Sequence, residues 1–473
     1  MPAIPALGRP LALLIACVIF FQLILFFKSN LSSSSDYHED SLDQPHSESS
    51  RWDDPGRNRH PSVPLSLQDL LVLDELADTI AKTESRRVFE NKEAGRIHGT
   101  RIKSNPELVQ KIRDQIRCWT THGTWQRQNQ EFSALKHLGD SRFAKCDKNF
   151  MKVLDRDGNG HYLGEFDHAH NRLLVREAVK YKWVPDETIC GPGAGPDKMG
   201  LEDAKAEYQE HSKTKLCEVM GQRDILVVGD LTQYQIHDVL LSAFQSTFVC
   251  YGELGCLHHG AHGLCQNVAL KYARNDLLSI PWAVNPEDEE YPSASTVEQA
   301  WATDDMLLKY KVLILNRGLF WRSDEVFLSE LVFTMRHLWK YYPDTMIIYR
   351  ATHPAATDCN QFKSQGEDEA IAGKSGESIV EGTTLQTPLK SQPKRKQHHQ
   401  GEYRPTLADI QRQNRIAKRV IEAAGGIYLD TEAMFALRPD GRMGDGDCAR
   451  FCAPGPLDAY ADLLYNTLRI LQA

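Results

Sequence analysis

Four short apolar runs alternate with helical patterns in the C-terminal half of the chain, and this alternation limits the fold more than any other feature. The runs are 224–228, 311–316, 345–352 and 425–431. Helical patterns precede the last two runs, "EVFLSELVFTMRHLWKYYP" and "TLADIQRQNRIAKRVIEAAGG". Strands that alternate with helices form a parallel sheet with helices on both faces. The sequence therefore predicts an α/β fold with three layers and a mostly parallel sheet.

The N-terminus carries a second strong signal. Residues 11–27 read "LALLIACVIFFQLILFF", close to the lower limit of about 17 residues for a membrane span. Arg9 precedes this run, and an acidic, serine-rich stretch follows Lys28, which favours a cytosolic N-terminus. We interpret residues 1–28 as a cytosolic tail and signal-anchor helix of a single-pass type II membrane protein. A cleaved signal peptide is the alternative.

The cysteines agree with a lumenal body. The chain has 11 cysteines, and Cys17 lies within the apolar run, which leaves ten. An even number fits disulfide bonds in an oxidising compartment, whereas buried free thiols are the alternative. The sequence does not give the pairing of these ten: Cys118, Cys146, Cys190, Cys217, Cys250, Cys256, Cys265, Cys359, Cys448 and Cys452.

Composition divides the rest of the chain. Residues 29–100 read as a polar stem followed by a helix from Ser66 to Lys82. Residues 101–473 form the main body and end in a predicted helix over 457–471. Within the body, about 364–404 has few apolar residues and reads as a disordered insertion. The net charge of −9 argues against a nucleic-acid partner.

Polar residues follow the predicted strands at the edge where parallel sheets bind ligands. The first strand ends in Gly229-Asp230, the second in Asn316-Arg317-Gly318, and the third in "RATH". The sequence therefore predicts that binding residues gather at this edge, and the candidates are Gly229, Asp230, Gly318, Arg350 and His353.

Several segments together resemble the PC-esterase family, which includes the trichome-birefringence-like polysaccharide O-acetyltransferases and belongs to the GDSL/SGNH superfamily. "ILVVGDL" resembles the family's strand followed by Gly-Asp-Ser, and "VLILNRGLFW" resembles its strand ending in Asn-x-Gly. "RPDGRMGDGDCARFCAPGPLDAYADLLY" resembles its Asp-Cys-x-His-Trp-Cys-x-Pro-Gly block. Upstream, "CWTTHGTW" and "VREAVKYKWVPDETIC" resemble its disulfide-rich N-terminal subdomain. The likeness covers most of 115–473 and implies an SGNH-like three-layer fold.

The resemblance also assigns positions within the catalytic site. The family's nucleophilic serine corresponds to Leu231, and its catalytic histidine corresponds to Arg450. Asp447 keeps the family's aspartate, and Asn316 keeps the asparagine that helps to bind the oxyanion. Leucine has no lone pair, and arginine stays protonated near neutral pH. The covalent route needs both a nucleophile and a base, so the resemblance implies impaired chemistry. Thr232 and His353 are the candidate substitutes.

Two segments carry motifs of metal sites. "DRDGNGHYLGEF" (155–166) resembles an EF-hand loop, but position twelve is Phe166 rather than glutamate. "CLHHGAHGLC" (256–265) has zinc-like spacing, but a disulfide-closed loop fits an oxidising lumen better. We therefore predict no metal and no cofactor.

Three functions remain open at this point. The first is a Golgi or ER membrane protein with a catalytically impaired PC-esterase-like domain that binds a glycan or assists an active family member. The second is an active carbohydrate O-acetyltransferase or acetylesterase with a non-standard nucleophile. The third is a Golgi glycosyltransferase, which the topology fits but the C-terminal Asp-Cys-x-x-x-Cys-x-Pro-Gly block opposes.

Overall fold

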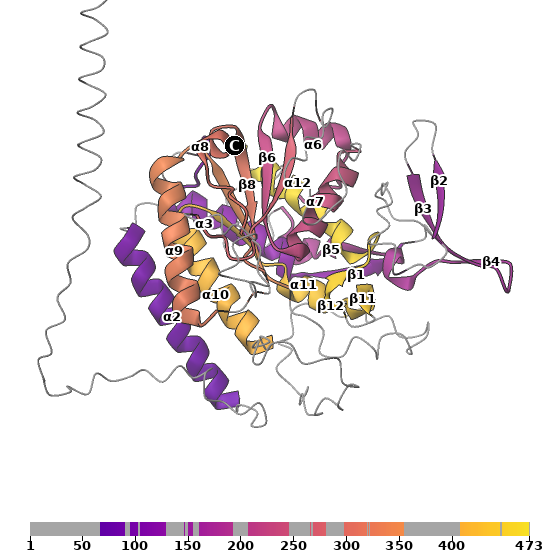
Figure 1. Cartoon of the computed structure of the whole chain (residues 1–473), viewed down its shortest axis with the longest axis horizontal. Helices are drawn as coiled ribbons and strands as arrows, with labels where there is room; N and C mark the ends of the chain where they lie inside the picture. Colours follow the sequence, from indigo (N-terminus) through magenta and orange to yellow (C-terminus); the bar gives the residue numbers. More distant parts are fainter. Residues whose placement is uncertain are drawn as a thin grey trace, which may run out of the picture. The chain divides into compact units, whose positions relative to one another are not determined.

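Five parallel strands form the central sheet in the computed structural model of this protein (Figure 1). Every neighbouring pair is parallel, in the order β10-β9-β8-β6-β7. Four of these strands confirm the predicted ones. The sequence missed β7, because Lys271 and Arg274 interrupt its apolar pattern although both side chains are buried. The strands are β6 (Asp224–Gly229), β7 (Leu270–Arg274), β8 (Tyr310–Leu315), β9 (Met346–Arg350) and β10 (Ile427–Leu429).

The structure describes residues 67–89, 95–102, 105–128, 146, 150–154, 160–192, 207–245, 265, 268–280, 298–318, 320, 322–353, 407–444 and 447–472. All of them belong to one unit, residues 61–473. Residues 1–66, with the predicted anchor and most of the predicted stem, lie outside the described ranges, as does the predicted insertion at about 364–404. Among the helices in those ranges, none is long and apolar enough to cross a membrane.

The strand order creates a switch point between β6 and β8. The first strand of the sheet, β6, lies between the second (β7) and the third (β8). From β6 the chain continues to β7 at one edge of the sheet. From β8 it continues through β9 to β10 at the other edge. In open parallel sheets, ligands bind outside the carboxyl ends of the strands that flank such a point.

Helices cover both faces of the sheet, which confirms the three-layer α/β prediction. Alternate strand residues serve the two faces: Ile225 and Val227 pack on one side, Leu226 and Val228 on the other. The first layer holds α3 (Pro106–Thr121), α6 (Lys213–Met220), α7 (Leu231–Ala243) and α12 (Ala459–Ile470). The second layer holds α2 (Leu67–Phe89), α8 (Asp304–Leu307), α9 (Asp324–Tyr341) and α10 (Leu407–Ala423).

Smaller elements lie beside the sheet. Strands β1 and β5 form an antiparallel pair whose Trp125 and Trp183 rings meet at 5.6 Å. Strands β2, β3 and β4 form a separate antiparallel sheet, and β11 pairs with β12 near the C-terminus. The strands are β1 (Gly123–Arg127), β2 (Phe150–Leu154), β3 (Gly160–Asp167), β4 (Arg172–Leu174), β5 (Tyr181–Pro185), β11 (Arg442–Gly444) and β12 (Asp447–Phe451). The short helices are η3 (Glu177–Lys180), α4 (Glu187–Cys190), α11 (Glu432–Ala436), η5 (Pro439–Gly441) and η6 (Pro456–Asp458).

Three disulfide bonds connect distant parts of the chain and confirm the prediction of disulfides. They join Cys118 to Cys190, Cys146 to Cys452 and Cys217 to Cys265. The second closes the longest loop, over 306 residues, and fastens the segment before β2 to the C-terminal block. These bonds use six of the ten cysteines outside the apolar run. For the other four, Cys250, Cys256, Cys359 and Cys448, no side chain is described.

Candidate functional site

The turn after β6 is tightly constrained. Gly229 has φ +153°, and a Cβ there would lie 2.5 Å from the carbonyl oxygen of Asn316. Asp230 follows and caps α7: its Oδ1 accepts from Thr232 N at 2.9 Å and from Thr232 Oγ1 at 2.7 Å. Leu231 is the first residue of the helix and is half-buried. Leu231 is therefore part of an ordinary capped helix start.

The end of β8 lies against this turn. Gly318 has φ +77°, and a Cβ there would collide with the Asp230 carboxylate. Only glycine fits this close approach without strain. Asn316 is fully buried, and its Nδ2 donates to Arg350 O at 2.9 Å and to Thr352 Oγ1 at 3.0 Å. Both amide hydrogens of Asn316 thus have partners within the protein. Its Oδ1 has no hydrogen-bond partner among the described residues.

Arg350 is the last residue of β9, and its side chain contacts the first turn of α7. The side chain is fully buried, and it donates from Nε to Gln233 Oε1 and from Nη2 to Thr232 Oγ1, each at 2.9 Å. Its Nη1 donates to Ala351 O at 2.9 Å. Burial lowers the pKa of Arg350, and the nearby Tyr460 and Asp230 oppose that effect. The guanidinium thus joins β9 to the α7 turn through uncharged acceptors.

Thr232 is consequently held from two sides. Its hydroxyl donates to Asp230 and accepts from the Arg350 guanidinium. The hydrogen bond from the cation occupies a lone pair that a nucleophile would use. The side chain is also buried. The geometry therefore disfavours Thr232 as a substitute for the missing serine.

His353 lies beyond β9 and is buried. Its ring packs against Phe435 at 4.3 Å and Phe451 at 5.8 Å, and Nε2 lies 3.3 Å from Thr431 Oγ1. Burial lowers the pKa of His353 well below its ordinary value, and the nearby Arg350 and Arg442 lower it further. A neutral, packed imidazole is an interior histidine rather than a surface ligand-binding group.

The C-terminal block contacts α7 through Gln235, a residue that the sequence did not single out. Its Nε2 donates to Phe451 O at 2.5 Å, and its Oε1 accepts from Phe451 N at 3.1 Å. Asp447 and Arg450 precede Phe451 in β12. Arg450 is half-buried, and the side chain of Asp447 lies outside what the structure describes. The segments that carry Leu231 and Arg450 therefore lie against each other.

The metal-like motifs lie largely outside the described residues. Residues 155–159 and 256–264 are not described, whereas residues 160–166 belong to β3, which pairs with β2. An EF-hand loop is flanked by helices, but strands flank this segment. In the described part, Cys118, His122 and Cys190 lie close enough to hold a metal ion. The two cysteines are joined in a disulfide, so no thiolates are available there.

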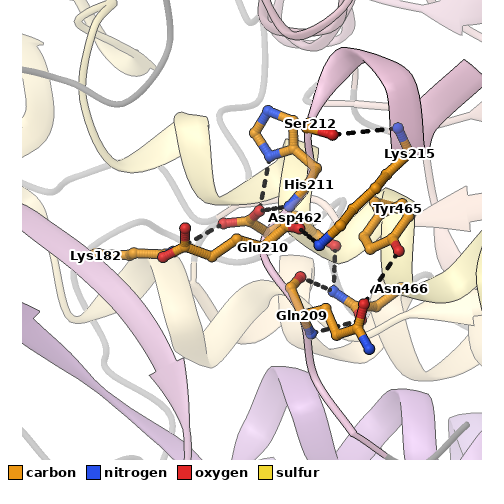
Figure 2. Close-up of polar contacts among 9 residues, drawn as sticks. All are labelled: Lys182, Gln209, Glu210, His211, Ser212, Lys215, Asp462, Tyr465 and Asn466. Carbon is orange, nitrogen blue, oxygen red and sulfur yellow. Dashed lines mark hydrogen bonds and ion pairs between the residues drawn. The ribbon is translucent and has the colours of Figure 1, made fainter. Parts of the chain in front are cut away.

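A second polar cluster, shown in Figure 2, lies away from the strand ends and was not expected from the sequence. Asp462 on α12 accepts at Oδ1 from both the backbone N and the ring Nδ1 of His211, each at 2.7 Å. Lys182 on β5 lies 3.7 Å from Asp462 Oδ2 and also pairs with Glu210. Burial alone would raise the pKa of Asp462, but the contacts with His211 and Lys182 outweigh it and lower the pKa.

The same cluster fixes the segment before α6 along α12. Asn466 accepts from Gln209 N at 2.9 Å and donates to Gln209 O at 2.7 Å (Figure 2). Ser212 then caps α6 through Lys215 N. These contacts satisfy the backbone of an irregular segment. The cluster therefore stabilises the junction between β5, the 207–212 segment and the C-terminal helix.

No protein-family model matches the chain, and no curated protein matches it at a significant level.

Proposed function

We propose that this protein is a single-pass type II membrane protein of the Golgi or ER whose lumenal domain resembles polysaccharide O-acetyltransferases but lacks ordinary acyl-transfer chemistry. Its role is then to bind a glycan or to assist an active member of the same family. The observation that carries this proposal is the hydroxyl of Thr232, held between Arg350 and Asp230 beside Leu231. It is the hydroxyl adjacent to the serine position, and one of its two lone pairs accepts a hydrogen bond from a cation.

The chemistry of acyl transfer explains why this arrangement matters. A hydroxyl must attack the acyl carbon, and a base must accept its proton. Leu231 offers neither group, and Arg450 cannot accept a proton near neutral pH. An oxyanion would have to compete for the Asn316 amide hydrogens, which already bond to Arg350 and Thr352. The binding role therefore has better support than an active enzyme with a non-standard nucleophile.

The test uses the full-length protein purified in detergent and a simple acetyl ester such as p-nitrophenyl acetate. We expect no turnover above the buffer rate from the native sequence. The double variant Leu231→Ser with Arg450→His restores a nucleophile and a base, and turnover by this variant alone would support a degenerate family site. Turnover by the native protein that survives Leu231→Ala would overturn the proposal.

A binding titration and a sugar-transfer assay complete the test. Titration of the purified protein with acetylated and deacetylated xylan or pectin examines the glycan-binding role. A radiolabelled sugar nucleotide with Mn²⁺ examines the glycosyltransferase alternative, and transfer of sugar in that assay would replace the proposal. We expect glycan binding without transfer.

A further inference from the structure

Lys271 on β7 is a buried lysine whose ammonium group has no carboxylate beside it. Only 8% of the residue is exposed, although β7 is an edge strand of the sheet. Its Nζ donates to Met306 Sδ at 2.9 Å, and a thioether sulfur is a weak acceptor. Among the described residues, no carboxylate lies within 4 Å of this Nζ. Buried lysines are ordinarily paired, so Lys271 departs from the way in which proteins bury an ammonium group.

A second lysine lies over the same aromatic ring as Lys271. Tyr310, the first residue of β8, is buried in the core of the second helix layer. The Nζ atoms of Lys271 and Lys309 lie 6.0 Å and 5.3 Å from the centre of its ring. Burial lowers the pKa of Lys271, and the charge of Lys309 lowers it further. The surroundings of Lys271 therefore favour the neutral amine over the ammonium form.

A neutral amine is a nucleophile, whereas an ammonium group is not. Enzymes activate nucleophilic lysines by the same two means, an apolar environment and a neighbouring cation. Met306 is half-buried and has a flexible side chain, so its movement gives a small reagent access to Nζ. Lys340 shows that a tyrosine ring alone does not make such a site: its Nζ lies 4.9 Å from the Tyr341 ring, but the residue is exposed.

We propose that Lys271 is a modification site that accepts acyl groups from small acyl thioesters. The neutral Nζ attacks the carbonyl carbon, an N–C bond forms, and the C–S bond breaks. The thiolate that leaves takes up the proton that the nitrogen loses, so no further reactant is needed. The product is an uncharged amide. This proposal is independent of the strand-end site and of the proposed function.

Acetylation of the full-length protein in detergent by the thioester S-acetyl-N-acetylcysteamine tests the proposal. Peptide mass spectrometry gives the rate constant at each lysine near neutral pH. We expect Lys271 to react at least ~5-fold faster than exposed Lys340. Urea should abolish this preference, because unfolding removes the burial of Lys271. A rate at Lys271 equal to or below that at Lys340 in the folded protein, or a preference that persists in urea, would overturn the proposal.

Two substitutions at Lys309 test the role of the second cation. Lys309→Gln removes the charge and should lower the rate at Lys271 by ~3-fold or more, whereas Lys309→Arg keeps the charge and should retain the native rate. Lys309 is exposed, so circular dichroism should show that both variants fold. Lys340→Gln is the matched control and should leave the rate at Lys271 unchanged. Equal rates at Lys271 in the two Lys309 variants would also overturn the proposal.

Discussion

Nη2 of Arg350 lies 2.9 Å from Thr232 Oγ1, although 118 residues separate the two in sequence. The bond connects the end of β9 to the first turn of α7, and Arg350 has no exposed surface. A buried donor that loses its acceptor keeps its full desolvation cost. The pair therefore stabilises the turn where the family resemblance expects a nucleophile.

The first prediction concerns this bond. Thr232→Val keeps the shape of the side chain but removes the acceptor for Arg350 and the donor to Asp230. We expect the free energy of unfolding to fall by about 1–3 kcal/mol, measured by urea denaturation. Thr232→Ser keeps the hydroxyl and should cost less. Thr79→Val on the exposed face of α2 is the control, and an equal loss there would contradict the argument.

The second prediction concerns the close approach of β8 to the α7 turn. Gly318→Ala should destabilise the protein, because φ is +77° and the new Cβ would meet the Asp230 carboxylate. Gly221→Ala is the matched control: φ is +59°, but nothing lies within 4 Å of its Cβ. We expect about 1–3 kcal/mol for Gly221→Ala from the backbone alone, because φ +59° with ψ −124° is a conformation that side chains rarely adopt. Thermal unfolding should show a clearly larger loss for Gly318→Ala, and equal losses would refute the steric argument.

The third prediction is a pH dependence at Asp462. Its pKa is lowered in the folded protein, so the folded carboxyl binds a proton more weakly than the unfolded one. Its contribution to stability is therefore present above the unfolded pKa of about 3.9 and is lost as pH falls through the lower folded value. Asp462→Asn should flatten this acid-side slope in urea unfolding from pH 5 downward. An acid-side slope that stays the same in Asp462→Asn as in the native protein would contradict this prediction.

The fourth prediction concerns the bond between Cys146 and Cys452. It closes a loop of 306 residues, so its removal frees much of the unfolded chain. Cys146→Ser with Cys452→Ser should lower the free energy of unfolding by about 2–5 kcal/mol. Mass spectrometry of a non-reduced digest checks the pairing first. A peptide that links Cys452 to any cysteine other than Cys146 would contradict this pairing.

Local patterns were enough for much of the sheet and its helices. The strands at 224–228 and 311–316 were predicted because their residues are apolar on both faces, as in a covered parallel sheet. Strand β7 was missed, because buried Lys271 and Arg274 look polar in sequence. Helix α2 runs to Phe89, past the predicted end at Lys82, because its later turns pack on the core and tertiary contacts outweigh local signals.

The strand-end site was predicted in part. Gly229, Asp230, Asn316 and Gly318 meet where the strand pattern places them, since parallel strands end at one edge. Arg350 was expected to bind a ligand, and only the structure shows its hydrogen bonds to Thr232 and Gln233. Gln235 had no signal, because a glutamine inside a helix looks like any surface residue until its partner Phe451 is known.

The sequence by itself determined the α/β class, most of the strands and the even set of cysteines outside the apolar run. Those features depend on residue type and local spacing, which sequence records directly. Only the tertiary structure decided the cysteine pairing, the partners of Arg350 and the contact of His211 with Asp462. Each of these joins residues far apart in the chain, and their distances depend on how whole elements pack.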